Sequence, residues 1–390
     1  MTRPLSVTGE RGNLKTVLVL SFTDLATDPR VSRQIRLLAT KYRVLAAGTA
    51  PPQVDGVKYL PIPEVPRRLP LKALGALHLK LGQYERYYWA DQRVQSCLQT
   101  LADNRADVIV ANDLVTLPVA LTLARGAKVV FDSHEYAPRE YEDRAQWRFF
   151  FQHYNDHICR SYLPRTDGML TVCQRIADEY RANYGVDPKV VANAPPYHDL
   201  SPGPTGLDHI RMVHHGVTIS SRKIELMIES MDFLDQRFRL DLMLIPSASQ
   251  YFRGLERIAA RHPRVRIVPP VPMTELPMRL NQYDIGLFLL PPTNFNYQYA
   301  LPNKFFEFIQ ARLAVAIGPS PEMARLVRQH DCGIVSEDFS PRALARMLNE
   351  LDRERIDYFK QRSHLAAREL CFEKNSGVLL DMIENLIGNS

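Results

Sequence analysis

The sequence predicts an α/β protein built from two doubly wound domains that face each other across a cleft. Short apolar segments alternate with amphipathic helical segments along most of the 390 residues. A stretch rich in Pro and Gly, Tyr197–Asp208, interrupts this alternation once, after which it restarts. Continuous apolar runs are typical of strands buried on both faces of a parallel sheet, and strands separated by helices are typical of βαβ units. Ligands of such sheets bind at the carboxyl ends of the strands.

The first half supplies the elements of one sheet. It opens on the apolar run TVLVLSF (16–22), which we interpret as a strand because it is too short to cross a membrane and no cleavage-site pattern follows it. In the next segment Val31, Ile35 and Leu38 recur at helical spacing. The further strand and helix segments are RVLAAG (43–48), ADVIVAN (106–112), LVTLPVALTLARG (114–126), KVVFDS (128–133), GMLTVC (168–173) and QRIADEYRANYG (174–185).

The second half repeats the same alternation. Its segments are IRMVHHG (210–216), KIELMIESMDFL (223–234), FRLDLMLIP (238–246), RGLERIAARHP (253–263), VRIVPPV (265–271), MTELPMRLNQY (273–283), DIGLFLLPP (284–292), ALPNKFFEFIQARLAVAIG (300–318) and CGIVSED (332–338). We therefore predict a first domain over 1–196, a linker over 197–208 and a second domain over 209–365. A last helix over 366–390 is expected to return to the first domain.

Composition excludes several classes of protein. The chain is 45% hydrophobic and 24% charged, which is typical of a globular protein, and its net charge of +6 favours anionic partners without choosing among them. Its five cysteines show no CxxC, which suits a reducing cytoplasm and argues against disulfides or a zinc site. The chain lacks GxxxxGKS, HExxH and GxSxG, and no DxD follows a strand, so we expect neither a metal nor a cofactor.

Several motifs together resemble one enzyme family. These are LPNKFFEF (301–308), IQARLAVAIGPSPEMARLV (309–327), TDPRVSRQIRLLA (27–39), VIVANDLVTLPVALTLA (108–124) and KVVFDSHEYAPREY (128–141). In order and spacing they are similar to family 4 glycosyltransferases of the GT-B fold, in the subgroup with an LPNK-x-x-E motif. The resemblance implies retaining transfer of a sugar from a nucleoside diphosphate sugar, the co-substrate, to a glycan or lipid-linked acceptor. Surface polysaccharide or glycoconjugate assembly is the setting that it favours.

The resemblance assigns a donor site to the second domain. A helix that begins near Asn303 would present backbone N–H groups and its positive dipole end to a diphosphate, with Lys304 adding a full charge. Glu307 matches the glutamate that holds the ribose, and a carboxylate can accept both hydrogen bonds of a diol. An ordinary ion pair between Lys304 and Glu307 is the alternative interpretation. Tyr299 stands where the family has the first glutamate of its paired-glutamate motif, which puts sugar recognition and activity in question.

Other expected residues lie outside that helix. The resemblance places Arg222 where the family has a phosphate-binding lysine, and Val217 where it has an arginine. Gly216 would allow the backbone to approach a ligand closely. Arg222 and its neighbour Lys223 could also be an exposed basic pair at a helix start.

In the first domain, His134 follows a strand and would face the cleft, and the resemblance implies that it touches the donor sugar near the reaction centre. A structural histidine that caps a loop is the alternative. Glu135, Asp113 and Asp24 are the further acceptor or cleft candidates, although a helix cap is the favoured interpretation for Asp113.

One segment allows contact with a membrane. In PRRLPLKALGALHLKLGQYERYYW (66–89), leucines and tyrosines recur at helical spacing with basic residues between them. Such a helix could lie on an anionic inner membrane surface, which would make a cytoplasmic protein peripheral. Packing against its own domain is the favoured alternative.

Three other functions remain open on the sequence. A nucleotide-sugar 2-epimerase shares the fold and would turn over its donor without an acceptor. A degenerate, non-catalytic GT-B partner subunit is suggested by Tyr299 and Val217. Nucleic-acid binding is the weakest, because no basic stripe with interleaved aromatic residues is present apart from segment 66–89.

Overall fold

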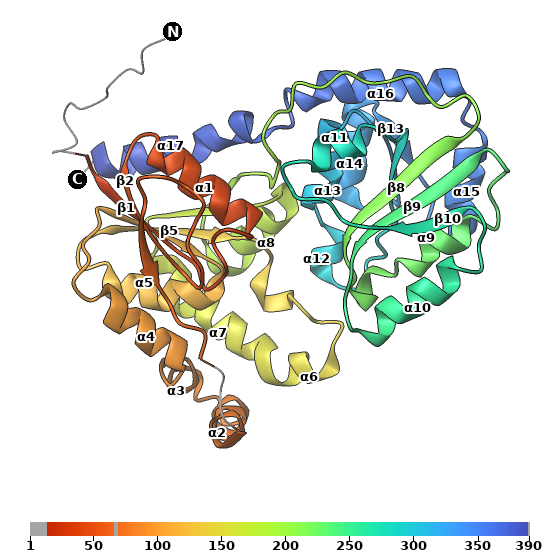
Figure 1. Ribbon diagram of the computed structural model, residues 1–390. Helices are drawn as coiled ribbons and strands as arrows, with labels where there is room; N and C mark the ends of the chain where they lie inside the picture. Colours follow the sequence, from red (N-terminus) through yellow and green to blue (C-terminus); the bar gives the residue numbers. More distant parts are fainter. Residues whose placement is uncertain (1–13, 66–68, 389–390) are drawn as a thin grey trace, which may run out of the picture.

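The computed structural model describes residues 14–65 and 69–388 and shows two α/β domains side by side (Figure 1). The sheet of the first domain is parallel, with strand order β3-β2-β1-β4-β5-β6-β7. Its strands are β1 (Thr16–Leu20), β2 (Arg43–Gly48), β3 (Lys58–Pro61), β4 (Val108–Asn112), β5 (Lys128–Ser133), β6 (Gly168–Thr171) and β7 (Lys189–Val190).

The helices of the first domain cover both faces of this sheet. They are α1 (Pro29–Ala39), α2 (Leu69–Lys80), α3 (Tyr84–Trp89), α4 (Gln92–Leu101), α5 (Leu117–Leu123), α6 (Ala145–Trp147), α7 (His153–Tyr162) and α8 (Gln174–Tyr184). A π-helical turn, Arg148–Gln152, joins α6 to α7. The helix α1 begins where the sequence provides both a cap and a proline. The Asp28 carboxylate accepts from the N–H groups of Arg30 and Val31, and Pro29 occupies the first turn.

The second domain repeats the architecture with six parallel strands in the order β10-β9-β8-β11-β12-β13. These are β8 (Ile210–Val217), β9 (Phe238–Ile245), β10 (Val265–Val268), β11 (Ile285–Phe288), β12 (Ala314–Ile317) and β13 (Gly333–Val335). Its helices are α9 (Glu225–Ser230), α10 (Gln250–Ala259), α11 (Leu276–Leu280), α12 (Phe295–Gln298), α13 (Asn303–Gln310), α14 (Pro321–His330), α15 (Pro341–Asn349) and α16 (Arg353–Ala367).

Strand order reverses once in each domain, between β1 and β4 and between β8 and β11. Ligands bind at such switch points, beyond the carboxyl ends of the strands. The central strands are apolar because both of their faces are covered, and in β1 Val17, Val19 and Leu20 are 0% exposed. Two doubly wound domains with facing switch points form the GT-B fold, as the sequence predicted.

The chain crosses between the domains twice. After β7, residues 191–209 carry it to the second domain without a helix or strand. At the other end, α17 (Phe372–Gly388) lies against the first domain, as the blue helix at the upper left of Figure 1 shows. Its Leu379 and Ile383 belong to the same buried cluster as Val17 and Val31. This helix therefore fastens the end of the chain to the domain in which the chain began.

The domains also touch directly beside the cleft. The N–H of Tyr136 donates to Asn296 Oδ1 at 2.8 Å, and Asn296 Nδ2 donates back to Tyr136 O at 3.2 Å. The N–H of Phe295 donates to Glu142 Oε1 at 2.7 Å, and the Phe295 ring lies 5.2 Å from that of Tyr136. Helix α12 is therefore held against the first domain.

The predicted amphipathic segment 66–89 is not one helix. It is divided between α2 and α3, because the chain turns at Gly82 with φ of +68°. Tyr88 of α3 is buried, and its hydroxyl donates to Val115 O at 2.8 Å. Leucines 71, 74, 77 and 81 are instead 40–59% exposed. Packing explains the second part of the segment, whereas in the first part Leu79 is buried and those four leucines remain exposed. Arg67 and Arg68 lie outside the described residues.

Candidate functional site

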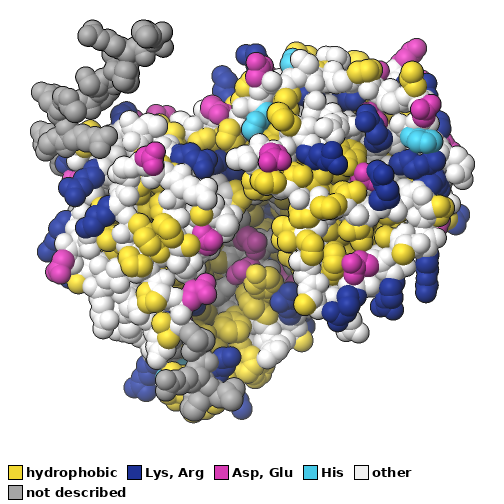
Figure 2. Space-filling view, in the orientation of Figure 1, with side chains coloured by type: hydrophobic (Ala, Val, Ile, Leu, Met, Phe, Trp, Pro, Cys, Tyr) yellow, Lys and Arg dark blue, Asp and Glu magenta, His cyan; other side chains and the backbone are white. Residues whose placement is uncertain are grey.

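Two cavities meet between the domains, where Figure 2 shows a recess with acidic side chains on its floor. We call them the donor cavity and the acceptor cavity, after the roles that the resemblance implies. The donor cavity, about 400 Å³, lies mainly against the second domain, and the acceptor cavity, about 710 Å³, lies in the first. His134 and Glu135 line both of them. A ligand in one cavity would therefore reach a ligand in the other at these two residues.

Lys304 lies at the floor of the donor cavity on the first turn of α13, and it is only 6% exposed. Its Nζ lies 3.2 Å from His214 Nε2 and 4.6 Å from the centre of the Phe288 ring. Because His214 Nδ1 faces Leu287 O at 3.0 Å, Nδ1 is the donor and Nε2 accepts from the lysine. Burial, and then the charge of Arg222, lower the pKa of Lys304 well below its usual value.

Glu307, one turn further along α13, faces the same cavity and is 5% exposed. Its Oε2 lies 3.3 Å from His215 Nε2 at the end of β8. Burial raises the pKa of Glu307 to about 7, against the influence of Lys304 and of Arg33 from the first domain. Burial, and then Lys304, lower the pKa of His215 to about 3, so this imidazole is neutral.

Three predicted residues complete the donor cavity. Gly216 has φ of +117°, so any other residue there would be strained, while a Cβ would make only ordinary contact with Lys304 Nζ at 3.5 Å. Asn303 starts α13, and its Oδ1 is buried without a hydrogen-bond partner among the described residues. Arg222 lines the wall half-buried. An orphaned acceptor beside a buried amine indicates that this cavity is shaped for a polar ligand.

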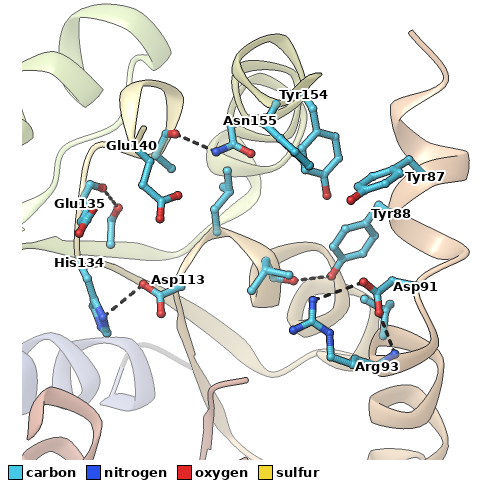
Figure 3. Close-up of a pocket in the computed structure, with 16 residues that line it drawn as sticks. Tyr87, Tyr88, Asp91, Arg93, Asp113, His134, Glu135, Glu140, Tyr154 and Asn155 are labelled. Atoms are coloured by element: carbon cyan, nitrogen blue, oxygen red, sulfur yellow. Dashed lines mark hydrogen bonds and ion pairs between the residues drawn. The ribbon is translucent and has the colours of Figure 1, made fainter. Parts of the chain in front are cut away.

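The acceptor cavity, drawn in Figure 3, has carboxyl groups on one side and aromatic rings on the other. Tyr87 and Tyr154 come from α3 and α7, with ring centres 5.1 Å apart, and Phe151 lies 6.3 Å from Tyr87. The carboxyl side consists of Asp113, Glu135 and Glu140, and Asp91 lies near Arg93.

His134 sits among acceptors at the carboxyl ends of β4 and β5. Its Nδ1 lies 3.2 Å from Asp113 Oδ1, and its Nε2 lies 3.2 Å from Asn112 Oδ1 and 3.7 Å from Asp132 Oδ2. Burial works to lower the pKa of His134, but the two carboxylates raise it to about 8. The imidazole is therefore mostly protonated at neutral pH.

Burial and neighbouring carboxylates raise the pKa values of both nearby glutamates. Burial, and then Glu140 and Asp113, raise the pKa of Glu135 to about 8. Burial, and then Asp113, raise the pKa of Glu140 to about 7. A cavity with this set of shifted groups is typical of a functional site.

A strained residue stands between these groups. Asp113 has φ of 64° and ψ of 151°, a region that glycine occupies almost alone. Its side chain caps no helix, so the favoured sequence interpretation was wrong, and it pairs with His134 instead. The strain is tolerated because the adjoining ends of β4 and β5 hold the backbone: the Asp113 N–H donates to Asp132 O at 3.1 Å.

The structure brings most of the predicted residues to these two cavities. His134, Glu135, Gly216, Arg222, Asn303, Lys304 and Glu307 line the donor cavity, and Asp113 lines the acceptor cavity. Arg222 belongs to a 3₁₀ turn, Ser220–Arg222, and not to a helix start, because Lys223 is left-handed with φ of 52°.

Two predicted residues are used elsewhere. Tyr299 packs at the domain boundary, under the guanidinium of Arg175 at 5.3 Å and next to Phe295. The Asp24 carboxylate accepts from the N–H of Ala26 at 2.8 Å, in a local turn. Neither residue lines a cavity.

Sequence reasoning missed the groups that support the site. Arg30 donates to both oxygens of Asp132, at 2.7 and 2.6 Å, beneath His134. Near the end of β8, His214 accepts a hydrogen bond from Lys304, and His215 Nε2 lies 3.3 Å from Glu307. The available signals were two arginines, Arg30 and Arg33, one turn apart at a helix start, and two adjacent histidines at the end of a strand.

Comparison with known proteins agrees with this geometry. Residues 29–196 match the family model described as a glycosyl transferase 4-like domain, which covers the first domain. No curated protein sequence matches the chain significantly. Within the described residues, no helix is long and apolar enough to cross a membrane, and no group of three or more His, Cys, Asp or Glu side chains could hold a metal ion.

Solved structures share the whole fold. Sucrose-phosphate synthase from Thermosynechococcus elongatus superposes with a TM-score of 0.72 at 13% identity, covering 97% of this chain and 100% of that one. HepE from Anabaena, solved with UDP-glucose, gives 0.69 at 12% identity, with 96% and 100% covered. TarM from S. aureus, solved with UDP among its ligands, gives 0.61 at 11% identity, with 76% and 59% covered. The family model supports a glycosyltransferase-type first domain, and the solved structures show that the fold is shared.

Proposed function

We propose that this chain, whose first domain matches a glycosyl transferase 4-like domain and whose fold is GT-B, is a retaining glycosyltransferase. It moves a sugar from a nucleoside diphosphate sugar in the donor cavity to a glycan or lipid-linked acceptor in the acceptor cavity. The observation that carries the proposal is the amine of Lys304, buried at a helix start with a neutral histidine as its hydrogen-bond partner and no carboxylate in an ion pair with it among the described residues. A diphosphate supplies the negative charge that this arrangement lacks.

The donor cavity would act on the leaving group. Lys304, Arg222 and the first N–H groups of α13 surround the place where negative charge develops on the departing diphosphate, and they stabilise it there. Glu307 accepts hydrogen bonds from the ribose diol. His134, on the border of the two cavities, lies against the transferred sugar and holds it in position.

Transfer would retain configuration through a front-face reaction. The bond between the anomeric carbon and the diphosphate oxygen breaks, and a bond from that carbon to the acceptor oxygen forms on the same face. The acceptor proton passes to the departing phosphate oxygen, so this step consumes no protein base. Surface polysaccharide or glycoconjugate assembly is the setting we infer.

Nucleotide binding by calorimetry tests the donor site. We expect one of UDP, GDP, ADP and CDP to bind the wild type, and Glu307→Ala to weaken it by about tenfold or more, because a charge-assisted hydrogen bond to the ribose is lost. Glu256→Ala on α10 is the matched control, since Glu256 is exposed and outside both cavities. If no nucleotide binds, the donor assignment fails and the degenerate partner subunit becomes the better description.

Product analysis separates the remaining enzymes. Incubation of the bound nucleotide's sugar conjugate with and without acceptor glycans, followed by NMR, should show an α-linked product from an α-linked donor only when acceptor is present. A β-linked product would contradict retention. Isomerised donor in the absence of acceptor would identify an epimerase.

The exposed leucines of α2 support a peripheral membrane position. Leucines 71, 74 and 77 remain uncovered, with Lys72 and Lys80 on the same helix, which suits the surface of an anionic bilayer. Liposome flotation should show binding that requires acidic lipid and falls in Leu74→Ser/Leu77→Ser. Equal flotation of this variant and the wild type would argue against α2 as the anchor.

A further inference from the structure

We propose that the acceptor cavity selects an uncharged, hydroxyl-rich acceptor, the neutral sugar end of a glycan, and rejects one that carries a phosphate or carboxylate beside the reacting hydroxyl. This inference rests on the proposed function and adds the chemical class of its second substrate. It is carried by three features of the cavity: the balance of charge in its wall, the wall of aromatic rings, and its junction with the donor cavity.

Acidic groups outnumber cations around the acceptor cavity. Its lining contains four carboxyl groups, those of Asp91, Asp113, Glu135 and Glu140. Its two cations each lie against one of them: His134 Nδ1 is 3.2 Å from Asp113, and Arg93 donates to Asp91 at 3.4 Å. A phosphate placed here would face Glu135 and Glu140 with no further cation among the lining residues to neutralise it, so both carboxyl groups would have to stay protonated beside it.

The same groups suit a neutral sugar. Glu135 and Glu140 extend into the cavity from one side in Figure 3, where carboxyl oxygens can accept hydrogen bonds from hydroxyl groups. The rings of Tyr87, Phe151 and Tyr154 form the other side and offer apolar area to the C–H face of a sugar ring. Hydrogen-bond acceptors opposite aromatic rings match a ligand whose edge is polar and whose face is apolar.

The junction of the cavities adds discrimination. An acceptor hydroxyl must reach the donor sugar past His134 and Glu135, which line both spaces. The cations of the donor cavity, Lys304 and Arg222, lie beyond this border. An anionic acceptor would therefore be attracted to the donor subsite and would compete with the nucleotide instead of occupying its own cavity.

Saturation-transfer NMR on the full chain tests this selection. The protein is first saturated with the nucleotide that calorimetry identifies, so that the donor cavity is filled. Glucose, glucuronate and glucose 6-phosphate are then compared as probes that share one ring and differ in charge. We expect glucose to bind at least about tenfold more tightly than either anion. The double variant Asp113→Asn/Glu140→Gln should narrow this ratio, and Glu256→Gln, an exposed residue of α10, should leave it unchanged.

The outcomes separate the two proposals. Nucleotide binding with anions bound as tightly as glucose overturns the acceptor class and leaves the donor assignment standing. If a nucleotide binds but none of the three sugars does, the acceptor class is overturned as well, because the acceptor cavity then binds no sugar. If Asp113→Asn/Glu140→Gln leaves the ratio of glucose affinity to anion affinity unchanged, these carboxyl groups do not cause the selection, and the proposal is overturned. Failure to bind any nucleotide removes the proposed function itself.

Discussion

A buried charged pair in the first domain contrasts with one buried lysine in the second. In the first, Arg30 donates to both carboxylate oxygens of Asp132 at 2.6–2.7 Å, and both side chains are almost fully enclosed. In the second, the nearest polar partner of the buried Lys304 is the neutral His214, at 3.2 Å. A charge neutralised inside the protein supports the fold, whereas one left without a close carboxylate is prepared for a ligand. The following substitutions test this contrast, from the largest expected effect to the smallest.

Asp132→Asn should cause the largest loss of stability. The substitution leaves the Arg30 guanidinium buried without its counter-charge, which costs about 3–5 kcal/mol. Urea unfolding measures the change in the free energy of unfolding. Asp187→Asn, the same change in an exposed ion pair with Arg181 and Lys189, is the control and should cost no more than about 1 kcal/mol. Similar losses in both variants would show that the buried pair has no special structural role.

Lys304→Met should separate binding from stability. We expect nucleotide affinity to fall by about 100-fold, because the charge facing the diphosphate is lost. The free energy of unfolding should stay the same or rise, since an apolar side chain of similar length replaces a buried amine. Calorimetry and urea unfolding measure the two quantities.

Lys360→Met is the matched control for that substitution. Lys360 is also buried in the second domain, but its Nζ lies 3.2 Å from the Asp284 carboxylate. Removing the Lys360 amine takes away a buried counter-charge of Asp284, so it should destabilise the protein by about 3 kcal/mol and leave nucleotide binding unchanged. If Lys304→Met and Lys360→Met lower the free energy of unfolding equally, the proposed difference between a lysine kept for a ligand and one paired with a carboxylate is refuted.

Asp113→Gly should stabilise the protein by about 1 kcal/mol, because glycine relieves the backbone strain at φ of 64°. Asp113→Asn removes the same charge without relieving the strain and should show no such gain. Both variants should transfer sugar more slowly, since each removes the carboxylate that holds His134. Equal stability of the two variants would mean that the strain at this position is negligible.

Glu140→Gln should change how stability depends on pH. The pKa of Glu140 in the folded protein is raised to about 7 from 4.5, so the folded protein retains a proton that the unfolded chain releases. Through this group, stability falls as pH rises from 4.5 to 7. The variant removes this contribution, and its Tm should fall about 2–4 °C less than that of the wild type across the window. Asp113, His134 and Glu135 titrate in both proteins, so their contributions cancel in the comparison. Tm values that fall equally with pH in both proteins would contradict the raised pKa of Glu140.

Local patterns were enough to predict the fold and the donor helix. Apolar runs separated by amphipathic segments indicated both parallel sheets, because the period of the pattern reports which faces are buried. Lys304 and Glu307 stood out because they lie within one turn of a helix whose start the sequence marks, but their expected donor roles came from the resemblance to family 4 glycosyltransferases. The prediction of one helix over 66–89 was wrong, because helical periodicity does not show that the chain turns at Gly82 between α2 and α3.

The sequence by itself determined the alternation of elements, the two domains and the presence of a basic helix start in the second. Only the tertiary structure decided what each charged group meets, because those contacts join elements far apart along the chain. Arg30 reaches Asp132 across 102 positions, and Lys304 reaches His214 across 90. Packing of α13 against β8 therefore gave Lys304 a neutral partner rather than Glu307, and the meeting of the two domains put His134 and Glu135 between the cavities.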